Sequence, residues 1–125
     1  MNVPADLKYT AEHEWIRVEG GEIVVGVTDF AQGELGDVVF IEIETQGETL
    51  SLGDTFGTIE AVKTVSDLYM PVDGEVLEVN SALEDTPELV NSEPFEGGWM
   101  IRVKMSDPSQ LDDLMSAEAY SALIG

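Results

Sequence analysis

The chain has 125 residues, of which 26 are acidic and five are basic, giving a formal net charge of -21. This length predicts one domain that buries most of its apolar surface, and a hydrophobic content of 43% is typical of globular proteins. The negative charge excludes nucleic acids and anionic membrane surfaces as partners and favours basic patches on other proteins. The absence of cysteine excludes disulfides, thiolate metal sites and a cysteine nucleophile.

Two explanations of the acidity stay open. The acidic residues are scattered along the chain, so they could confer solubility, for example in a high-salt cytosol, or steer partner proteins. Residues 1–6 show no basic region followed by an apolar run, and no stretch of the chain approaches membrane-spanning length. We therefore expect a cytoplasmic protein.

The predicted elements begin with a β-hairpin. Residues 15–18 and 23–27 are rich in β-branched residues and flank the glycine pair at 20–21, which predicts two strands joined by a two-residue turn. Thr28 then predicts the N-cap of a short helix over residues 29–35.

Gly36 is expected to end that helix, because glycine readily adopts the left-handed conformation found at helix C-termini. Further runs of β-branched or alternating residues predict four strands, at residues 38–43, 55–62, 65–69 and 75–79. The bend between the second and third of these strands contains Lys63.

The last third of the chain predicts one helical turn, one strand and two further helices. Residues 86–91 carry a proline at the first helical position, and residues 99–105 alternate as a strand does. Asp107 and Ser116 predict the caps of two C-terminal helices, the second over residues 117–123. No long linker splits the chain, so the sequence predicts a mostly β barrel or sandwich with short helices added, mainly at the C-terminus.

Lys63, one of three lysines, is the strongest candidate site. It could be an ordinary surface lysine that pairs with Glu60 or Asp67, an interaction worth about 0.2–1 kcal/mol. An enzyme that forms a Schiff base would need a desolvated amine, and the two flanking acids oppose the required fall in its pKa. A carrier needs only a projecting amine, because the attaching enzyme supplies the activation. The local chemistry therefore favours a carrier over an enzyme and predicts no catalytic residue.

The remaining candidates give weaker hypotheses. His13, the only histidine, lies between carboxylates without a partner that would make it a general base, and it is interpreted as structural. One histidine with scattered acids lacks metal-ligand spacing, so no metal site is predicted. Trp15 and Trp99 are expected in the core.

With these residues in place, the chain resembles the H protein of the glycine cleavage system over essentially its whole length. The matching segments, in chain order, are Tyr9 with 13–15, 26–32, 35–37, 60–67 with Pro71 and Gly74, Asn80, 87–91, Pro94 and 97–99.

The resemblance implies a lipoyl/biotinyl-domain-like barrel-sandwich hybrid, a flattened barrel of two small sheets. The single domain would span residues 1–125, with a core roughly over 14–105 and a C-terminal helical segment roughly over 107–124. Lys63 would lie at a hairpin tip and carry lipoic acid in amide linkage. Biotin carriers share this fold, but their lysine typically lies between methionines, whereas Val62 and Thr64 flank Lys63.

The resemblance also implies roles for four further residues. Glu60 and Gly74 are expected to help the lipoate-attaching enzyme recognise the hairpin, through a readable carboxylate and a turn glycine that sets its geometry. Glu14 and Asp67 match positions used against the cationic amine of the loaded arm, in a cleft that protects it from water.

The implied function is that of a carrier in glycine catabolism and one-carbon metabolism, acted on by three enzymes. A pyridoxal-phosphate glycine decarboxylase would load the aminomethyl group, a tetrahydrofolate-dependent aminomethyltransferase would take it, and dihydrolipoyl dehydrogenase would reoxidise the arm. The protein is expected to be a monomer. Two alternatives stay open: an H-like protein that relays lipoyl groups to other lipoyl domains, and an unmodified β-domain acting as an enzyme or interaction module.

Overall fold

The computed structural model describes residues 3–125. Residues 1–2, which belong to the expected domain and to the segment 1–6 discussed above, lie outside the described residues. The strands are β1 Lys8–Tyr9, β2 Glu14–Glu19, β3 Glu22–Val27, β4 Val38–Glu42, β5 Thr49–Leu50, β6 Thr55–Ala61, β7 Val65–Tyr69, β8 Gly74–Val79 and β9 Ile101–Met105. The helices are α1 Asp29–Leu35, α2 Ala82–Asp85, α3 Leu89–Ser92, the 3₁₀ helix η1 Pro108–Asp113 and α4 Ala117–Ile124.

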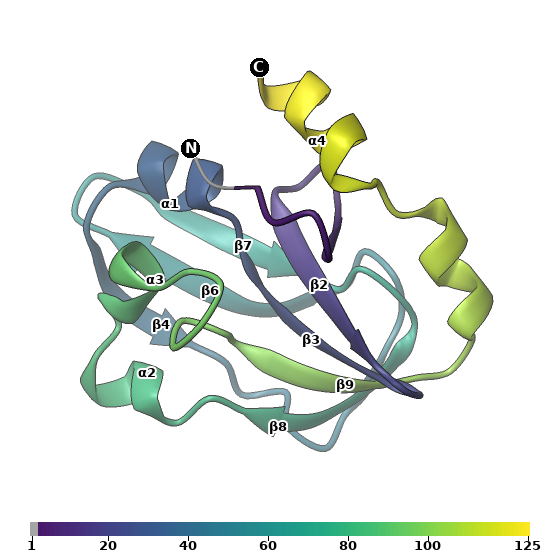
Figure 1. Cartoon of the computed structure of the whole chain (residues 1–125). Coiled ribbons are helices and arrows are strands. Elements are labelled where there is room, and N and C mark those ends of the chain that lie inside the picture. The colour runs from purple at the N-terminus through teal and green to yellow at the C-terminus, as the bar shows by residue number, and fades with distance from the viewer. Residues whose placement is uncertain (1–2) are drawn as a thin grey trace.

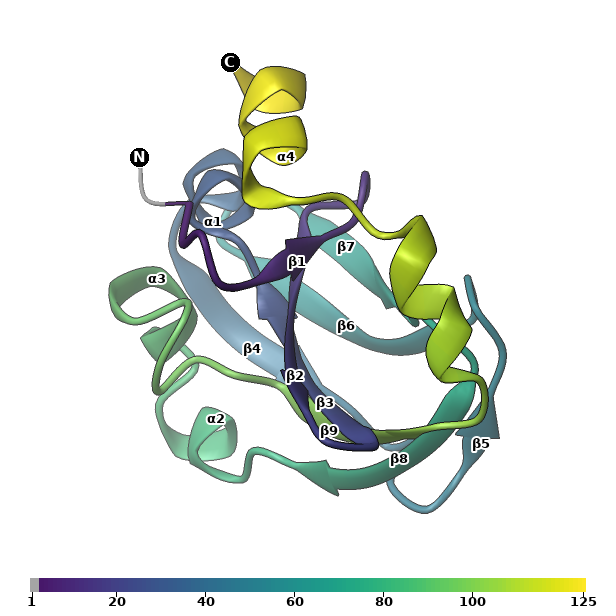
Figure 2. The same cartoon turned by 45° about the vertical axis from the view of Figure 1, so that its right-hand side comes forward.

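The strands form two antiparallel sheets, as expected for a flattened barrel. The larger sheet has the order β1-β2-β3-β9-β8-β5, and the smaller has the order β4-β6-β7. Figure 1 shows the smaller sheet facing the larger one, with α2 and α3 at one side and α4 beyond the edge of the barrel. In Figure 2, η1 and α4 run along one side of the molecule, and α4 stands beside β1. The mostly β fold with added helices is thus confirmed.

Local sequence rules account for the elements at the start of the barrel. β2 and β3 pair from Glu19 with Glu22 onward, and Gly20 has a φ of 71°, a conformation that glycine adopts without a Cβ clash. Thr28 caps α1, because its side chain accepts a hydrogen bond from the Ala31 N–H. Gly36 ends α1 with a φ of 81°, and its N–H donates to the Gln32 carbonyl.

Several boundaries differ from the sequence predictions. The turn expected over 86–91 becomes helical only at Leu89, because its first hydrogen bonds span three residues rather than four. Asp107 does cap a helix, but the same short bonds make that helix 3₁₀. Trp99 precedes the last strand, which begins at Ile101. Three short elements were not predicted: β1, β5 and α2.

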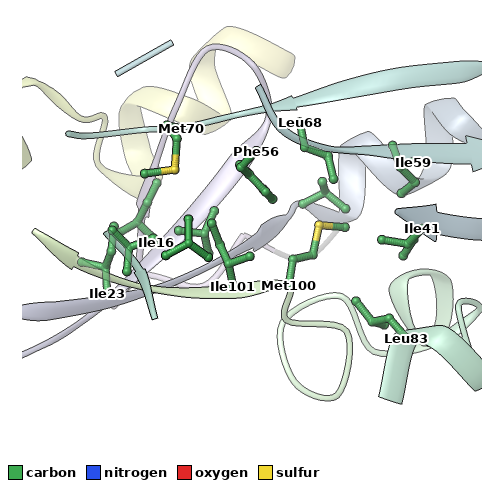
Figure 3. Close-up of a cluster of buried hydrophobic side chains, with 14 of the residues drawn as sticks. Ile16, Ile23, Ile41, Phe56, Ile59, Leu68, Met70, Leu83, Met100 and Ile101 are labelled. Atoms are coloured by element: carbon green, nitrogen blue, oxygen red, sulfur yellow. The ribbon is translucent and has the colours of Figure 1, made fainter. Parts of the chain in front are cut away.

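The main core fills the space between the sheets. Side chains from both sheets, among them Ile16, Ile101, Phe56 and Leu68, point toward one another in Figure 3 and are at most 2% exposed. Alternating burial along β9 produces this arrangement, since successive residues of a strand face opposite sides of its sheet. The core therefore fixes the smaller sheet, which carries the Lys63 hairpin, on the larger one.

A second apolar cluster joins the chain termini to the outer face of the larger sheet. Tyr9 of β1 and Tyr120 of α4 are fully buried and stack with ring centroids 4.7 Å apart. Trp15 is also fully buried, as predicted, and its Nε1 donates to the Pro94 carbonyl at 2.8 Å. The C-terminal helix is thus part of the packed structure. No helix within residues 3–125 is long and apolar enough to cross a membrane.

Candidate functional site

Lys63 lies at the exposed tip of the β6–β7 hairpin. The Ala61 N–H donates to the Thr64 carbonyl at 2.8 Å, which leaves Val62 and Lys63 as the two central residues of the turn. The Val62 N–H donates in turn to the Asp37 carbonyl at 3.0 Å, tying the tip to the turn after α1. In Figure 1 this hairpin end lies beside that turn. The geometry holds the backbone of the lysine and leaves its amine accessible.

Gly36 provides the surface on which the lysine side chain rests. A Cβ atom at Gly36 would lie 3.3 Å from the Lys63 Cε and 3.8 Å from its Nζ, so the positive φ favours glycine and the missing side chain leaves room for the lysine. Asn91 of α3 fixes the turn: its Nδ2 donates to the Gly36 carbonyl at 2.8 Å, and its Oδ1 accepts the Val38 N–H at 2.9 Å. Three segments that are distant in sequence therefore position one lysine.

An exposed apolar row lies on the outer face of the smaller sheet. Phe40 on β4 pairs with Glu60 on β6, and Glu60 pairs with Val65 on β7. The exposed fractions of Phe40 and Val65 are 51% and 63%, and that of Val62 at the tip is 75%. Glu60 is exposed between the two apolar side chains. The carboxylate predicted to serve recognition thus lies between exposed apolar side chains on the hairpin that carries Lys63.

A cleft of about 390 Å³ opens between α1, β7 and the segment that enters β2. Its volume falls within the usual range for small-molecule sites. The cleft is lined by Glu12, His13, Glu14, Val27, Phe30, Ala31, Glu34, Leu35, Ile59, Ser66, Asp67 and Leu68. Leu35 immediately precedes Gly36, so the cleft begins next to the lysine contact. Apolar side chains and four carboxylates together suit an apolar chain that ends in a cation.

Glu14 is the buried acid of this cleft, with an exposed fraction of 3%. Burial raises the pKa of its carboxyl from 4.5 to about 7, and the nearby Glu12 charge adds to that rise. Two hydrogen bonds oppose the rise in pKa, from the Tyr69 N–H at 3.0 Å and from the Thr10 hydroxyl at 3.0 Å. With a pKa of about 7, the Glu14 carboxyl is partly protonated near neutral pH, so a cation beside it would shift it to the ionised form.

The structure brings four of the five predicted site residues to one region and places the fifth elsewhere. Glu14 and Asp67 line the same cleft, while Lys63 and Glu60 belong to the hairpin beside it. Gly74 is instead the buried first residue of β8, in the other sheet. A Cβ there would lie 2.5 Å from the Lys104 carbonyl oxygen, so close packing against β9 accounts for this glycine. It does not set the turn of the Lys63 hairpin.

Sequence reasoning assigned no role to several residues that line the cleft. Phe30, Ala31 and Leu35 line the cleft from α1. Their spacing along the helix was the available indication that they share a face. His13 also lines the cleft and has a φ of 68°, which no sequence pattern reveals. A larger cavity of about 640 Å³ lies beyond Glu14, under η1, and shares only Glu12 and Glu14 with the cleft.

Two small sheets packed face to face, with an exposed lysine at a hairpin tip and a cleft beside it, define a carrier domain of the lipoyl/biotinyl type.

Comparison with known proteins narrows this class to a family. Residues 7–125 match the family Glycine cleavage H-protein. A protein of Staphylococcus saprophyticus named Glycine cleavage system H protein is 57% identical over 125 residues, covering 100% of this chain and 99% of the relative. One of the same name from Bacteroides thetaiotaomicron is 60% identical over 124 residues, covering 99% and 98%. A crystal structure of a glycine cleavage system H protein from Mycobacterium marinum is similar with a TM-score of 0.90 and 38% identity, covering 98% of this chain and 99% of that one. The chain belongs to the glycine cleavage H-protein family, whose members are lipoyl-bearing carrier proteins.

Proposed function

We propose that the protein carries a lipoyl group in amide linkage on Lys63 and shuttles the aminomethyl group of glycine between enzymes. The observation that carries this proposal is the exposed amine at the hairpin tip, beside a cleft with an apolar lining and acidic residues. When bound, the lipoyl group supplies a dithiolane that accepts and donates the aminomethyl group. The protein itself supplies a tether and a sheltered site rather than catalytic side chains.

The residues of the chain position and shelter the arm. The lysine side chain lies against Gly36, in the turn after α1, and Leu35 of the cleft is the next residue along the chain. The apolar residues of α1, β6 and β7 would cover the hydrocarbon chain and exclude water from it. Glu14 and Asp67 would face the cationic amine, because carboxylates favour a nearby positive charge.

The proposed partners follow from the carrier role. They are the pyridoxal-phosphate glycine decarboxylase, the tetrahydrofolate-dependent aminomethyltransferase, dihydrolipoyl dehydrogenase and the lipoate-attaching enzyme. A net charge of -21 would speed encounters with basic surfaces on these enzymes. A monomeric carrier in the cytoplasm completes the proposal, since each enzyme must reach the same hairpin in turn.

The test is an intact-mass measurement on protein from cells that make lipoate. The wild-type protein should gain the mass of one lipoyl group, and Lys63→Arg should abolish the gain. Lys104→Arg is the matched control, because Lys104 is an exposed lysine on β9. No gain in the wild type, or a gain that survives Lys63→Arg, would sink the proposal.

A further inference from the structure

One hydroxyl group connects the C-terminal helix to two sides of the cleft. The Tyr120 Oη of α4 lies 2.9 Å from the His13 Nδ1 and 2.7 Å from the Thr28 Oγ1. His13 belongs to the segment that leads into Glu14, and Thr28 is the cap of α1. Both segments line the cleft, and the Thr28 N–H also donates to the His13 carbonyl at 3.1 Å, so the hydroxyl joins a pair of residues that the backbone already holds together.

The direction of these hydrogen bonds follows from Thr28. Its side chain is buried, and its Oγ1 already accepts the Ala31 N–H at 3.2 Å. The Thr28 hydroxyl proton needs an acceptor, and among residues 3–125 the Tyr120 Oη is the one that hydrogen-bonds to it. Tyr120 then donates its own proton to the His13 Nδ1. The reverse direction would leave a buried hydroxyl proton without an acceptor, which is costly.

The other ring nitrogen of His13 therefore carries the proton. An imidazole whose Nδ1 accepts a hydrogen bond has its hydrogen on Nε2. Within the described part of the chain, Nε2 forms no hydrogen bond, and His13 lines the cleft. The φ of 68° at His13 is unusual for a residue with a side chain. Ring contacts with Phe30 at 4.8 Å and Tyr120 at 5.8 Å hold the imidazole in place.

We propose that Tyr120 fixes His13 as the Nε2–H tautomer and thereby presents a hydrogen-bond donor to the group tethered on Lys63. Apart from the Ser66 hydroxyl, which donates to the Asp67 carbonyl at 3.5 Å, the other polar side chains of the cleft are acceptors, namely the carboxylates of Glu12, Glu14, Glu34 and Asp67. Those carboxylates suit the amine of the arm, whereas the Nε2–H suits its acceptors, the sulfur atoms and the amide oxygen. Tyr120 is a positioning residue in this scheme. The inference rests on the proposed function only for the identity of the tethered group.

The tautomer can be measured on the unmodified protein, because His13 is the only histidine. Nitrogen-15 NMR of the labelled imidazole, at a pH where the ring is neutral, should show a protonated Nε2 and an unprotonated Nδ1. Tyr120→Phe should shift both resonances toward an average of the two tautomers. Tyr9→Phe is the matched control: it removes a hydroxyl that donates to Pro4 in the same cluster, and it should leave the His13 spectrum unchanged. A protonated Nδ1 in the wild type, or no response to Tyr120→Phe, would overturn the assignment.

The second half of the proposal concerns the arm. Incubating lipoylated protein with glycine decarboxylase and glycine should shift the Nε2 resonance of the wild type and slow exchange of its proton with water. An unchanged Nε2 in the loaded protein would overturn the role as donor. If Lys63 carries no lipoyl mass, the proposed function fails while the tautomer measurement still decides the role of Tyr120.

Discussion

Replacing Glu14 by glutamine should change how the stability of the protein depends on pH. Burial raises the pKa of the Glu14 carboxyl from 4.5 to about 7 in the folded protein. Because the folded state holds this proton more tightly than the unfolded state, protonation of Glu14 stabilises the fold. That contribution is fully present below pH 4.5 and is lost as the pH rises through about 7.

The magnitude follows from the two pKa values. The interval from 4.5 to about 7, at 1.36 kcal/mol per pH unit, corresponds to about 3 kcal/mol. Glutamine has the same shape and no charge to bury. Its Oε1 can accept the Tyr69 N–H, whereas the Thr10 hydroxyl, whose oxygen already accepts the Glu12 and Glu14 N–H groups, loses its acceptor. That loss does not titrate, so it offsets the stability difference by a constant amount and leaves its pH dependence unchanged. The free energy of unfolding of the wild type minus that of the variant should therefore fall by about 3 kcal/mol between acid pH and about pH 8.

Urea unfolding at a series of pH values, followed by tryptophan fluorescence, measures this difference. Carboxyls other than Glu14 titrate in both proteins and cancel in the subtraction. Glu34→Gln is the matched control, because Glu34 lines the same cleft but is exposed, so it tests whether removing any carboxylate of the cleft reproduces the effect. A flat or rising difference for Glu14→Gln would refute burial as the cause of the raised pKa.

Three further predictions concern the hairpin and its support. Asn91→Ala should lower the free energy of unfolding by about 2 kcal/mol, because the Val38 N–H and the Gly36 carbonyl lose their hydrogen-bond partner; an unchanged urea midpoint would contradict this. Glu60→Gln should slow lipoylation of Lys63 in a ligase assay. Glu42→Gln, on the same face of the smaller sheet but on β4, should not; a rate for Glu60→Gln equal to that of the wild type would show that Glu60 has no part in recognition. Gly74→Ala should cost about 1–3 kcal/mol of stability through overpacking, and a calorimetric midpoint equal to that of the wild type would refute that account.

Local chemistry explains which parts of the fold were predictable. The caps at Thr28 and Ser116 and the turn at Gly20 depend on interactions within about four residues, which a sequence displays directly. β1 and β5 are two residues long and exist because a neighbouring strand pairs with them, so no run in the sequence marks them.

Glu14 and Asp67, which were named from the sequence, line one cleft, but the contacts that hold this cleft could not be predicted from the sequence. The hydrogen bond from the Tyr69 N–H to Glu14 joins positions 55 residues apart, and no sequence pattern between them predicts it. The same holds for the contact of Tyr120 with His13, 107 residues away. For Gly74 the family resemblance suggested a role at the hairpin. The structure instead explains this glycine by its packing against the backbone of β9, which leaves no room for a side chain.

The raised pKa of Glu14 also predicts how the cleft would hold a cationic amine. A cation beside Glu14 favours its ionised form, so binding of the amine near neutral pH should release a proton. By linkage, the amine should be held more tightly as the pH rises through about 7, where Glu14 becomes ionised without help. The rate at which loaded protein loses labelled aminomethyl group, measured across this range, should therefore fall with pH in the wild type relative to Glu14→Gln. Parallel pH profiles for the two proteins would show that Glu14 does not bind the amine, because only a titrating acid in contact with that charge couples its retention to this proton.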